Sequence, residues 1–108
     1  MYPRDLDKTY FSSDTGKLKQ FFEVSGKIPF EAGFEKTGWK MEDVKRFFIH
    51  QVSMDICQKF IDISDVPKER VSIILDKYGN TASTSIPIAF SEAFENGEIR
   101  SGDKVVFV

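Results

Sequence analysis

The chain has 108 residues, of which 41% are hydrophobic and 14% aromatic, and this composition predicts one folded domain rather than a disordered chain. Its net charge is −2 without a stripe of Lys and Arg, which argues against nucleic acid as a partner, and apolar runs of only about five residues argue against a membrane span. A single Cys excludes an internal disulfide and suits a reducing compartment, so we expect a cytoplasmic protein. One Cys and one His also make a metal site improbable.

The first third of the chain gives weak structural signals. Residues 1–18 are polar and contain turn-forming residues, which predicts a lead-in or loop. Phe21 to Val24 is a candidate short strand that ends at a Ser-Gly pair. Pro29 to Thr37 is expected to form a short helix, because proline fits the first helical turn, and Gly38 suits its C-terminal cap.

A regular alternation of strands and helices follows. Residues 44–49 predict a buried strand, and residues 52–63 predict a helix whose wide apolar stripe implies burial against a sheet and a second layer. A turn at residues 65–68 separates this helix from residues 71–75, which predict a second buried strand.

The last third of the chain predicts one more helix and one more strand. A helix is expected because apolar residues recur at helical spacing, at Ile86, Ala89, Phe90, Ala93 and Phe94. Asn96 and Gly97 end this helix, a turn follows at residues 101–103, and residues 105–108 predict a third buried strand. The alternating order and the apolar strands together predict the α/β class, with a parallel sheet in a βαβαβ core. Because the chain stops on an apolar strand, we also expect a truncated domain.

Polar residues follow the first two predicted strands. His50 and Gln51 come after the first strand, and Gly79 and Asn80 come after the second. Functional groups of parallel sheets gather beyond the carboxyl ends of the strands. If the two strands are neighbours, N–H groups of His50 and Asn80 can both donate to one carbonyl oxygen and stabilise negative charge on it. Gly79 would allow a tight turn that exposes Asn80.

Plainer interpretations exist for the same residues. A lone His at a strand end is more often structural, and Asn80 suits the capping of the following helix. The hydroxyl residues within 81–85 can be polar groups of a helix N-terminus with no chemical task. Cys57 is expected to be a core residue, and at about 10 Å from His50 along a helix it is a poor dyad partner.

The stretches that contain these motifs resemble the C-terminal half of a β-ketoacyl-acyl-carrier-protein synthase III. That family has a His-Gln pair after one strand and Gly-Asn-Thr after the next. The matching residues here are His50-Gln51 and Gly79-Asn80-Thr81. A following Ser-Ile-Pro and the tail "SGDKVVFV" extend the resemblance, which covers residues 38–108 well and 19–37 loosely. It implies a thiolase-like half with flanking helices, and residues 1–108 would be a partial C-terminal domain.

The resemblance also implies an activity. Such enzymes are acyltransferases of fatty acid biosynthesis, in which a Cys takes an acyl group from acyl-coenzyme A. A His and an Asn then hold the thioester carbonyl of malonyl on its acyl carrier protein while carbon dioxide leaves, and the enolate attacks the acyl-Cys. By this analogy His50 and Asn80 are catalytic, and Gln51, Ser53 and Gly79 belong to the substrate-binding part, where Gln51 positions the loop. No cofactor and no metal are implied.

The same resemblance implies that the chain is incomplete alone. The family's nucleophilic Cys lies in the N-terminal half, and Cys57 matches no nucleophile position. The isolated chain is therefore expected to be inactive, whereas the full-length enzyme would be a cytoplasmic homodimer. Because the two halves pack closely, this chain by itself should show an uncovered apolar surface.

Two departures from the family pattern motivate an alternative. Val52-Ser53 stands where the family often has Ala-Asn, whose Asn contacts the pantetheine region. Asp55 stands where an Arg often serves carrier-protein docking, and an acidic residue would repel an acidic carrier. The alternative is a non-catalytic partner or regulatory subunit of a complete condensing enzyme, and a specialised synthase stays open. A nucleotide-binding domain is disfavoured, because no glycine-rich phosphate loop is present.

Overall fold

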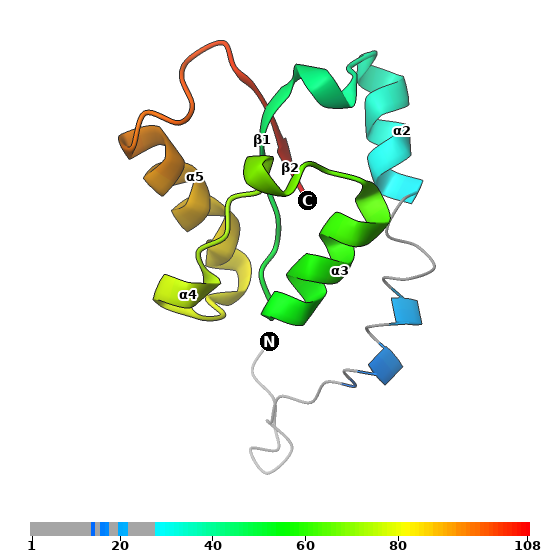
Figure 1. Ribbon diagram of the computed structural model, residues 1–108, viewed down its shortest axis with the longest axis vertical. Coiled ribbons are helices and arrows are strands. Elements are labelled where there is room, and N and C mark those ends of the chain that lie inside the picture. Colours follow the sequence, from blue (N-terminus) through cyan, green and yellow to red (C-terminus); the bar gives the residue numbers. More distant parts are fainter. Residues whose placement is uncertain (1–13, 15, 18–19, 22–27) are drawn as a thin grey trace, which may run out of the picture.

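The computed structural model describes residue 14, residues 16–17, residues 20–21 and residues 28–108. Two groups of helices enclose the strands: in Figure 1, α2 and α3 lie on one side of β1 and β2, and α5 lies on the other. This arrangement confirms the predicted α/β class. In chain order the elements are α2 (Ile28–Thr37), β1 (Val44–Phe48), α3 (Met54–Ser64), α4 (Leu75–Tyr78), α5 (Ser85–Glu95) and β2 (Lys104–Phe107).

The sheet formed by β1 and β2 is parallel, as predicted. Its register shifts between Val44 and Arg46, which marks a β-bulge in β1. Residues three apart on a regular strand face opposite sides, yet Val44 and Phe47 both belong to the core on the α3 side. The bulge accounts for this placement. It lets Val44 and Phe47 pack on one face of β1 while Phe48 packs on the other.

The C-terminal part of β1 is buried on both faces, although Lys45 and Arg46 interrupt its apolar residues. Phe47 and Phe48 are each 0% exposed and belong to separate core clusters. Burial of this kind stabilises the fold by about 1.5–3 kcal/mol for each large side chain. The buried residues on the α3 side are Val44, Phe47, Ile49, Cys57, Ile61, Val66 and Val71, and those on the α5 side are Phe48, Ile74, Ala89, Ala93 and Ile99.

Local capping residues set the helix ends. Ser53 is the N-cap of α3, where its Oγ accepts the N–H of Ile56 at 3.4 Å. Asp55 lies in the first turn of the same helix, where the positive end of the helix dipole favours a carboxylate. Gly38 follows α2 with φ +67°, a left-handed conformation that suits a glycine C-cap, as predicted. Asp65 ends α3 in the same conformation, with φ 56°.

The predicted second strand at residues 71–75 is wrong. One isolated parallel bridge joins Val71 to Phe47, and the N–H of Ser72 donates to the Phe47 carbonyl at 3.1 Å. Beyond that point the backbone bonds to the side chain of Gln51 instead of a strand, and the chain then enters α4. The predicted three-stranded core is therefore a two-stranded sheet with a single bridge beside it.

Predictions for the N-terminal part fall largely outside the described residues. Of the lead-in at residues 1–18, the structure describes only residues 14, 16 and 17, and the last two are helical rather than loop. Of the candidate strand Phe21–Val24, only Phe21 is described, and it is helical. A short apolar run satisfies a helix as readily as a strand, because its length does not distinguish the two.

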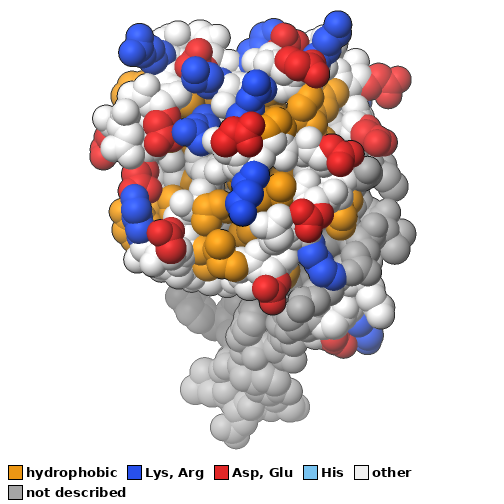
Figure 2. All heavy atoms as spheres, viewed as in Figure 1, with side chains coloured by type: hydrophobic (Ala, Val, Ile, Leu, Met, Phe, Trp, Pro, Cys, Tyr) orange, Lys and Arg blue, Asp and Glu red, His pale blue; other side chains and the backbone are white. Residues whose placement is uncertain are grey.

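Large apolar side chains remain exposed on the described part of the chain, which matches the expected uncovered surface. Phe90 on α5 and Phe107 on β2 each lie against the buried ring of Phe48, with ring centroids 5.5 and 5.6 Å away. Figure 2 shows one face of the molecule, where charged side chains of both signs are interspersed between hydrophobic ones. The exposed large apolar residues are Phe21, Met54, Tyr78, Phe90, Phe94, Phe107 and Val108.

Cys57 is a core residue, as predicted, and is 2% exposed. Burial raises the pKa of its thiol, so the thiolate fraction at neutral pH is smaller than that of a free Cys. We expect the folded chain to react with a disulfide reagent such as DTNB about a hundredfold or more slowly than the urea-unfolded chain. The single Cys makes the absorbance signal unambiguous. Similar rates in the two states would contradict this burial.

Candidate functional site

His50 lies just beyond β1, at the carboxyl end of the sheet. Its backbone N–H donates to the Val108 carbonyl at 2.9 Å, and the Val108 N–H donates to the Phe48 carbonyl at 2.9 Å, so the parallel ladder continues to this point. The His50 side chain is exposed, and its Nδ1 lies 3.2 Å from Oγ of Ser85. Among the described residues no hydrogen bond engages Nε2.

Gln51 is 0% exposed and joins three parts of the chain. Its backbone N–H donates to Oγ of Ser85 at 3.3 Å. Its side-chain Nε2 donates to the Ser72 carbonyl at 2.8 Å, and its Oε1 accepts the Ile74 N–H at 2.9 Å. The amide therefore replaces a strand partner for residues 72–74, the segment that leads into α4 and the Asn80 loop.

The loop after α4 presents Asn80 to solvent. Gly79 has φ +66° and ψ −159°, and no atom within 4 Å would meet an added Cβ, so the backbone angle rather than space requires glycine here. Ala82 also has a left-handed backbone, with φ 51°, which is costly for a residue with a Cβ. The Asn80 Oδ1 accepts the Ala82 N–H at 2.9 Å, and in the described chain its amide NH₂ makes no hydrogen bond.

One ion pair links the start of this loop to α5, and one hydrogen bond lies within the loop. Lys77 at the end of α4 forms an ion pair with Glu92 of α5, and this hydrogen bond to Glu92 raises the pKa of Lys77. Thr84 Oγ1 donates to the Thr81 carbonyl at 2.6 Å within the loop. The loop thus has one contact near its α4 end and one near its α5 end.

Ser85 is a site residue that sequence reasoning missed. It is the first residue of α5 and 0% exposed, and its hydroxyl contacts both His50 and Gln51. The structure thereby brings the end of the Asn80 loop to the end of β1. The sequence signal was present but ambiguous, because Ser85 stands in a run of hydroxyl residues of the kind that begin helices.

The predicted substrate-binding residues each have a structural task. Gln51 uses its amide for the chain's own backbone, Ser53 caps α3, and Gly79 supplies the backbone bend before Asn80. For these three residues, contact with substrate stays a prediction. The expectation that Gly79 would expose Asn80 agrees with the observed loop.

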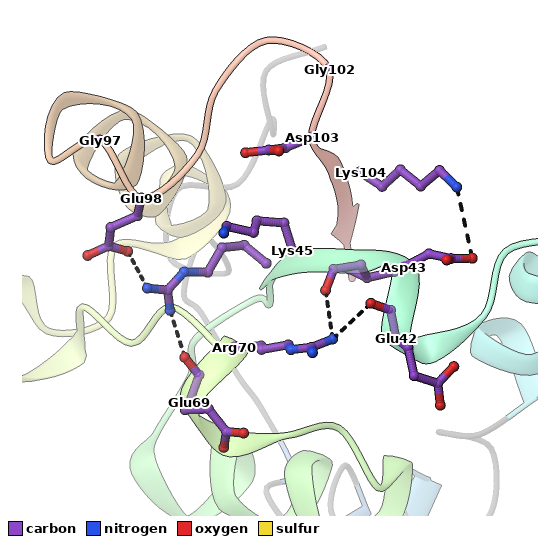
Figure 3. A pocket seen from close by; sticks show the side chains of 12 residues that line it. Glu42, Asp43, Lys45, Glu69, Arg70, Gly97, Glu98, Gly102, Asp103 and Lys104 are labelled. Carbon is purple, nitrogen blue, oxygen red and sulfur yellow. Dashed lines mark hydrogen bonds and ion pairs between the residues drawn. The ribbon is translucent and has the colours of Figure 1, made fainter.

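A charged hollow of about 680 Å³ lies at the opposite, amino end of the strands (Figure 3). Arg46 pairs with the Glu98 carboxylate at 2.7 Å and donates to the Glu69 carbonyl at 2.9 Å. Arg70 donates to backbone carbonyls just before and within β1. Because these guanidinium groups are used by the chain itself, we regard the hollow as a structural network.

The described residues contain neither a membrane-spanning helix nor a cluster of metal-binding side chains. No helix there is long and apolar enough to cross a lipid bilayer. In the same part of the chain, no group of three or more His, Cys, Asp or Glu side chains is placed to hold a metal ion.

Residues 34–108 match the family model for the 3-oxoacyl-[acyl-carrier-protein (ACP)] synthase III C terminal. The chain is 35% identical over 112 residues to the β-ketoacyl-[acyl-carrier-protein] synthase III of Helicobacter pylori strain J99, covering 94% of this chain and 34% of that protein. It also resembles the solved FabH of Pseudomonas aeruginosa PAO1, with a TM-score of 0.83 and 26% identity over 99% of this chain and 34% of that chain. For the Thermus thermophilus enzyme the TM-score is 0.81, with 32% identity over 98% of this chain and 34% of that chain.

The parallel strands between helices, and the similarity to these solved enzymes, define a thiolase-like condensing-enzyme fold. The chain belongs to the 3-oxoacyl-[acyl-carrier-protein] synthase III C-terminal family. It spans 34% of the length of the curated relatives it matches. The resemblance drawn from the sequence motifs is thereby confirmed.

Proposed function

We propose that this chain supplies the His/Asn half of the active site of a synthase III-like acyltransferase. The N–H at Nε2 of His50 and the amide NH₂ of Asn80 donate to the thioester carbonyl oxygen of a malonyl group. Carbon dioxide leaves, the electron pair of the broken C–C bond forms an enolate, and the two donors stabilise its oxygen. The enolate carbon then attacks an acyl group held as a thioester on a Cys that this chain does not supply. A C–C bond forms as the C–S bond of that thioester breaks, and the Cys leaves as a thiolate.

One observation supports this proposal: both side chains are exposed, and each has a nitrogen that makes no hydrogen bond in the described chain. The loop uses the oxygen of the Asn80 amide, which leaves its NH₂ group, and Ser85 lies at Nδ1 of His50, which leaves Nε2. Both residues follow segments joined at the carboxyl end of the sheet by Gln51. Donors fixed in this way act on developing negative charge without reorganising, which is how an oxyanion site lowers a barrier.

The nucleophile is proposed to lie outside this chain. Cys57, the single Cys, is buried among apolar side chains and its thiol pKa is raised, which are the opposite of the exposure and lowered pKa that a reactive Cys needs. The relatives are about three times as long as this chain, which leaves room for a nucleophile-bearing half. We therefore propose that the isolated chain does not condense substrates.

The partners belong to the same proposal. The relatives' names specify an acyl carrier protein, and we extend that carrier to this chain as the bearer of the malonyl group. Acyl-coenzyme A as acyl donor, a homodimeric full-length enzyme and a cytoplasmic location complete it, with no role for a metal, a cofactor, nucleic acid or a membrane.

The alternative of a non-catalytic partner subunit rested on Ser53 and Asp55. Both residues have a structural role in α3 that accounts for their presence, because Ser53 is the N-cap of the helix and Asp55 lies in its first turn. The two departures therefore give no support to a regulatory role. Activation of a complete synthase by added isolated chain would support that role instead.

The test uses a synthase III in which this chain forms the C-terminal segment, and it measures carbon dioxide release from a malonyl thioester. His50→Ala is expected to lower that rate by about 10²–10³-fold, because it removes one donor to the developing enolate. Since His50 is exposed, the thermal midpoint should stay within a few degrees. Gln58→Ala, at another exposed residue, is the control and should keep the rate. Unchanged release in His50→Ala would reject the proposal.

A further inference from the structure

We infer that Ser85 fixes which ring nitrogen of His50 carries the hydrogen, and so makes His50 a donor at Nε2. The catalytic meaning of this inference rests on the proposed function. Its structural content rests only on the hydrogen bonds around Ser85. Ser85 is thus a positioning residue that acts through His50.

The hydroxyl of Ser85 lies between two partners with different capacities. Its Oγ is 3.3 Å from the backbone nitrogen of Gln51 and 3.2 Å from Nδ1 of His50. A backbone N–H can only donate, so Oγ is the acceptor in the bond to Gln51. An imidazole nitrogen can donate or accept, so the second bond depends on the hydrogen of the hydroxyl.

Burial decides where that hydrogen goes. Ser85 is 0% exposed, so its hydroxyl cannot turn to solvent, and within the described chain no carbonyl accepts from it. If Nδ1 carried a hydrogen, the buried hydroxyl would lose its acceptor, which is an unfavourable state. Nδ1 is therefore the lone-pair nitrogen, and in the neutral ring Nε2 carries the hydrogen.

The other hydroxyl groups of the loop do not share this geometry. Thr84 Oγ1 donates to the Thr81 carbonyl, and Ser83 is exposed. Ser85 is the hydroxyl residue that contacts His50, and it does so from the first turn of α5, whose N-cap is Thr84. The Ser85 hydroxyl therefore contacts the imidazole of His50 and does not cap the helix.

This tautomer is the one that the proposed chemistry requires. A hydrogen at Nε2 can be donated to the enolate oxygen, whereas the opposite tautomer would place a lone pair against developing negative charge. Ser85 also bonds the Gln51 backbone, while the Gln51 side chain holds residues 72–74. One buried hydroxyl therefore connects the orientation of His50 to the scaffold of the Asn80 loop.

The experiment reads the tautomer directly by long-range ¹H–¹⁵N correlation of the imidazole, which is unambiguous because the chain has one His. Spectra are recorded at increasing pH until the ring signals stop changing. In the unmodified chain, Nδ1 is expected to resonate as a bare nitrogen and Nε2 as a protonated one. In Ser85→Ala the two signals should move toward each other, as the tautomer ratio falls by about tenfold or more. Ser83→Ala, in the same loop, should match the unmodified chain, and Ser85→Thr, which keeps the hydroxyl, should restore its spectrum.

Two results would overturn the inference: an even mixture or an Nδ1–H ring in the unmodified chain, or an unchanged spectrum in Ser85→Ala. If circular dichroism shows that Ser85→Ala is unfolded, the unmodified chain and Ser85→Thr still decide the matter. The readout needs no catalysis, so loss of the Nε2–H form in Ser85→Ala supports the inference whatever His50→Ala does. Unchanged decarboxylation in His50→Ala rejects the proposed function alone.

Discussion

Replacing Gln51 by leucine is expected to destabilise the chain by about 2–5 kcal/mol, because two buried backbone groups lose their partners together. The Ser72 carbonyl and the Ile74 N–H bond to the Gln51 amide at 2.8 and 2.9 Å, and Gln51 itself is 0% exposed. Leucine has a similar volume but offers neither a donor nor an acceptor. The loss would be a large fraction of the 5–15 kcal/mol that stabilises a typical domain.

Urea unfolding followed by the fluorescence of the single Trp, Trp39, measures this loss. Gln58→Leu is the matched control, since Gln58 lies on the exposed side of α3 and, within the described residues, its side chain bonds the Asp62 side chain alone, at 2.8 Å. The control should change the free energy of unfolding by less than about 0.5 kcal/mol. Equal stability of Gln51→Leu and the unmodified chain would show that Gln51 does not hold residues 72–74.

Asn80→Asp is expected to lower malonyl decarboxylation by about 10²–10³-fold while leaving the fold intact. The carboxylate keeps an oxygen to accept the Ala82 N–H, so the turn survives. It replaces the NH₂ donor with a second negatively charged oxygen, which repels the charge that develops on the enolate. The substitution therefore separates the role of Asn80 in the turn to Ala82 from its proposed role as a donor.

The measurement is again carbon dioxide release by a synthase III that contains this segment, paired with thermal unfolding. Asn96→Asp is the control, because Asn96 is exposed at the far end of α5 and should leave the rate unchanged. If Asn80→Ala lost activity and Asn80→Asp kept it, Asn80 would act through the turn alone, and its proposed role as a donor would be wrong.

Elements with a long periodic pattern could be predicted from the sequence. The helices α3 and α5 and the strands β1 and β2 all appear within about two residues of their expected bounds, which is the usual uncertainty of helix and strand ends. The spacing of their apolar residues indicates which face is buried, and that same face packs against the rest of the fold. The tight turn at Gly79, before Asn80, could also be predicted, because glycine is the residue that most readily adopts a positive φ.

The second strand and Ser85 could not be predicted for a common reason. Residues 71–75 have the composition of a buried strand, but whether they pair with β1 depends on Gln51, some twenty residues earlier, whose amide takes over the backbone partners. Likewise, several hydroxyl residues begin α5, and only the packing against β1 determines which one is buried. The pattern of apolar residues in a single sequence indicates local burial only. It does not indicate long-range hydrogen bonds such as those of Gln51 and Ser85.

The hydrogen bonds from the Gln51 side chain to residues 72–74 affect how the proposed site would bind a substrate. His50 is fixed by the strand ladder, and the loop that carries Asn80 is tied to the same strand by a buried amide. The backbone segments that carry these two groups are therefore ordered when the chain folds, which lowers the entropic cost of positioning the groups for a ligand. If His50 and Asn80 act together as proposed, the fold itself supplies part of their positioning before a carbonyl group arrives.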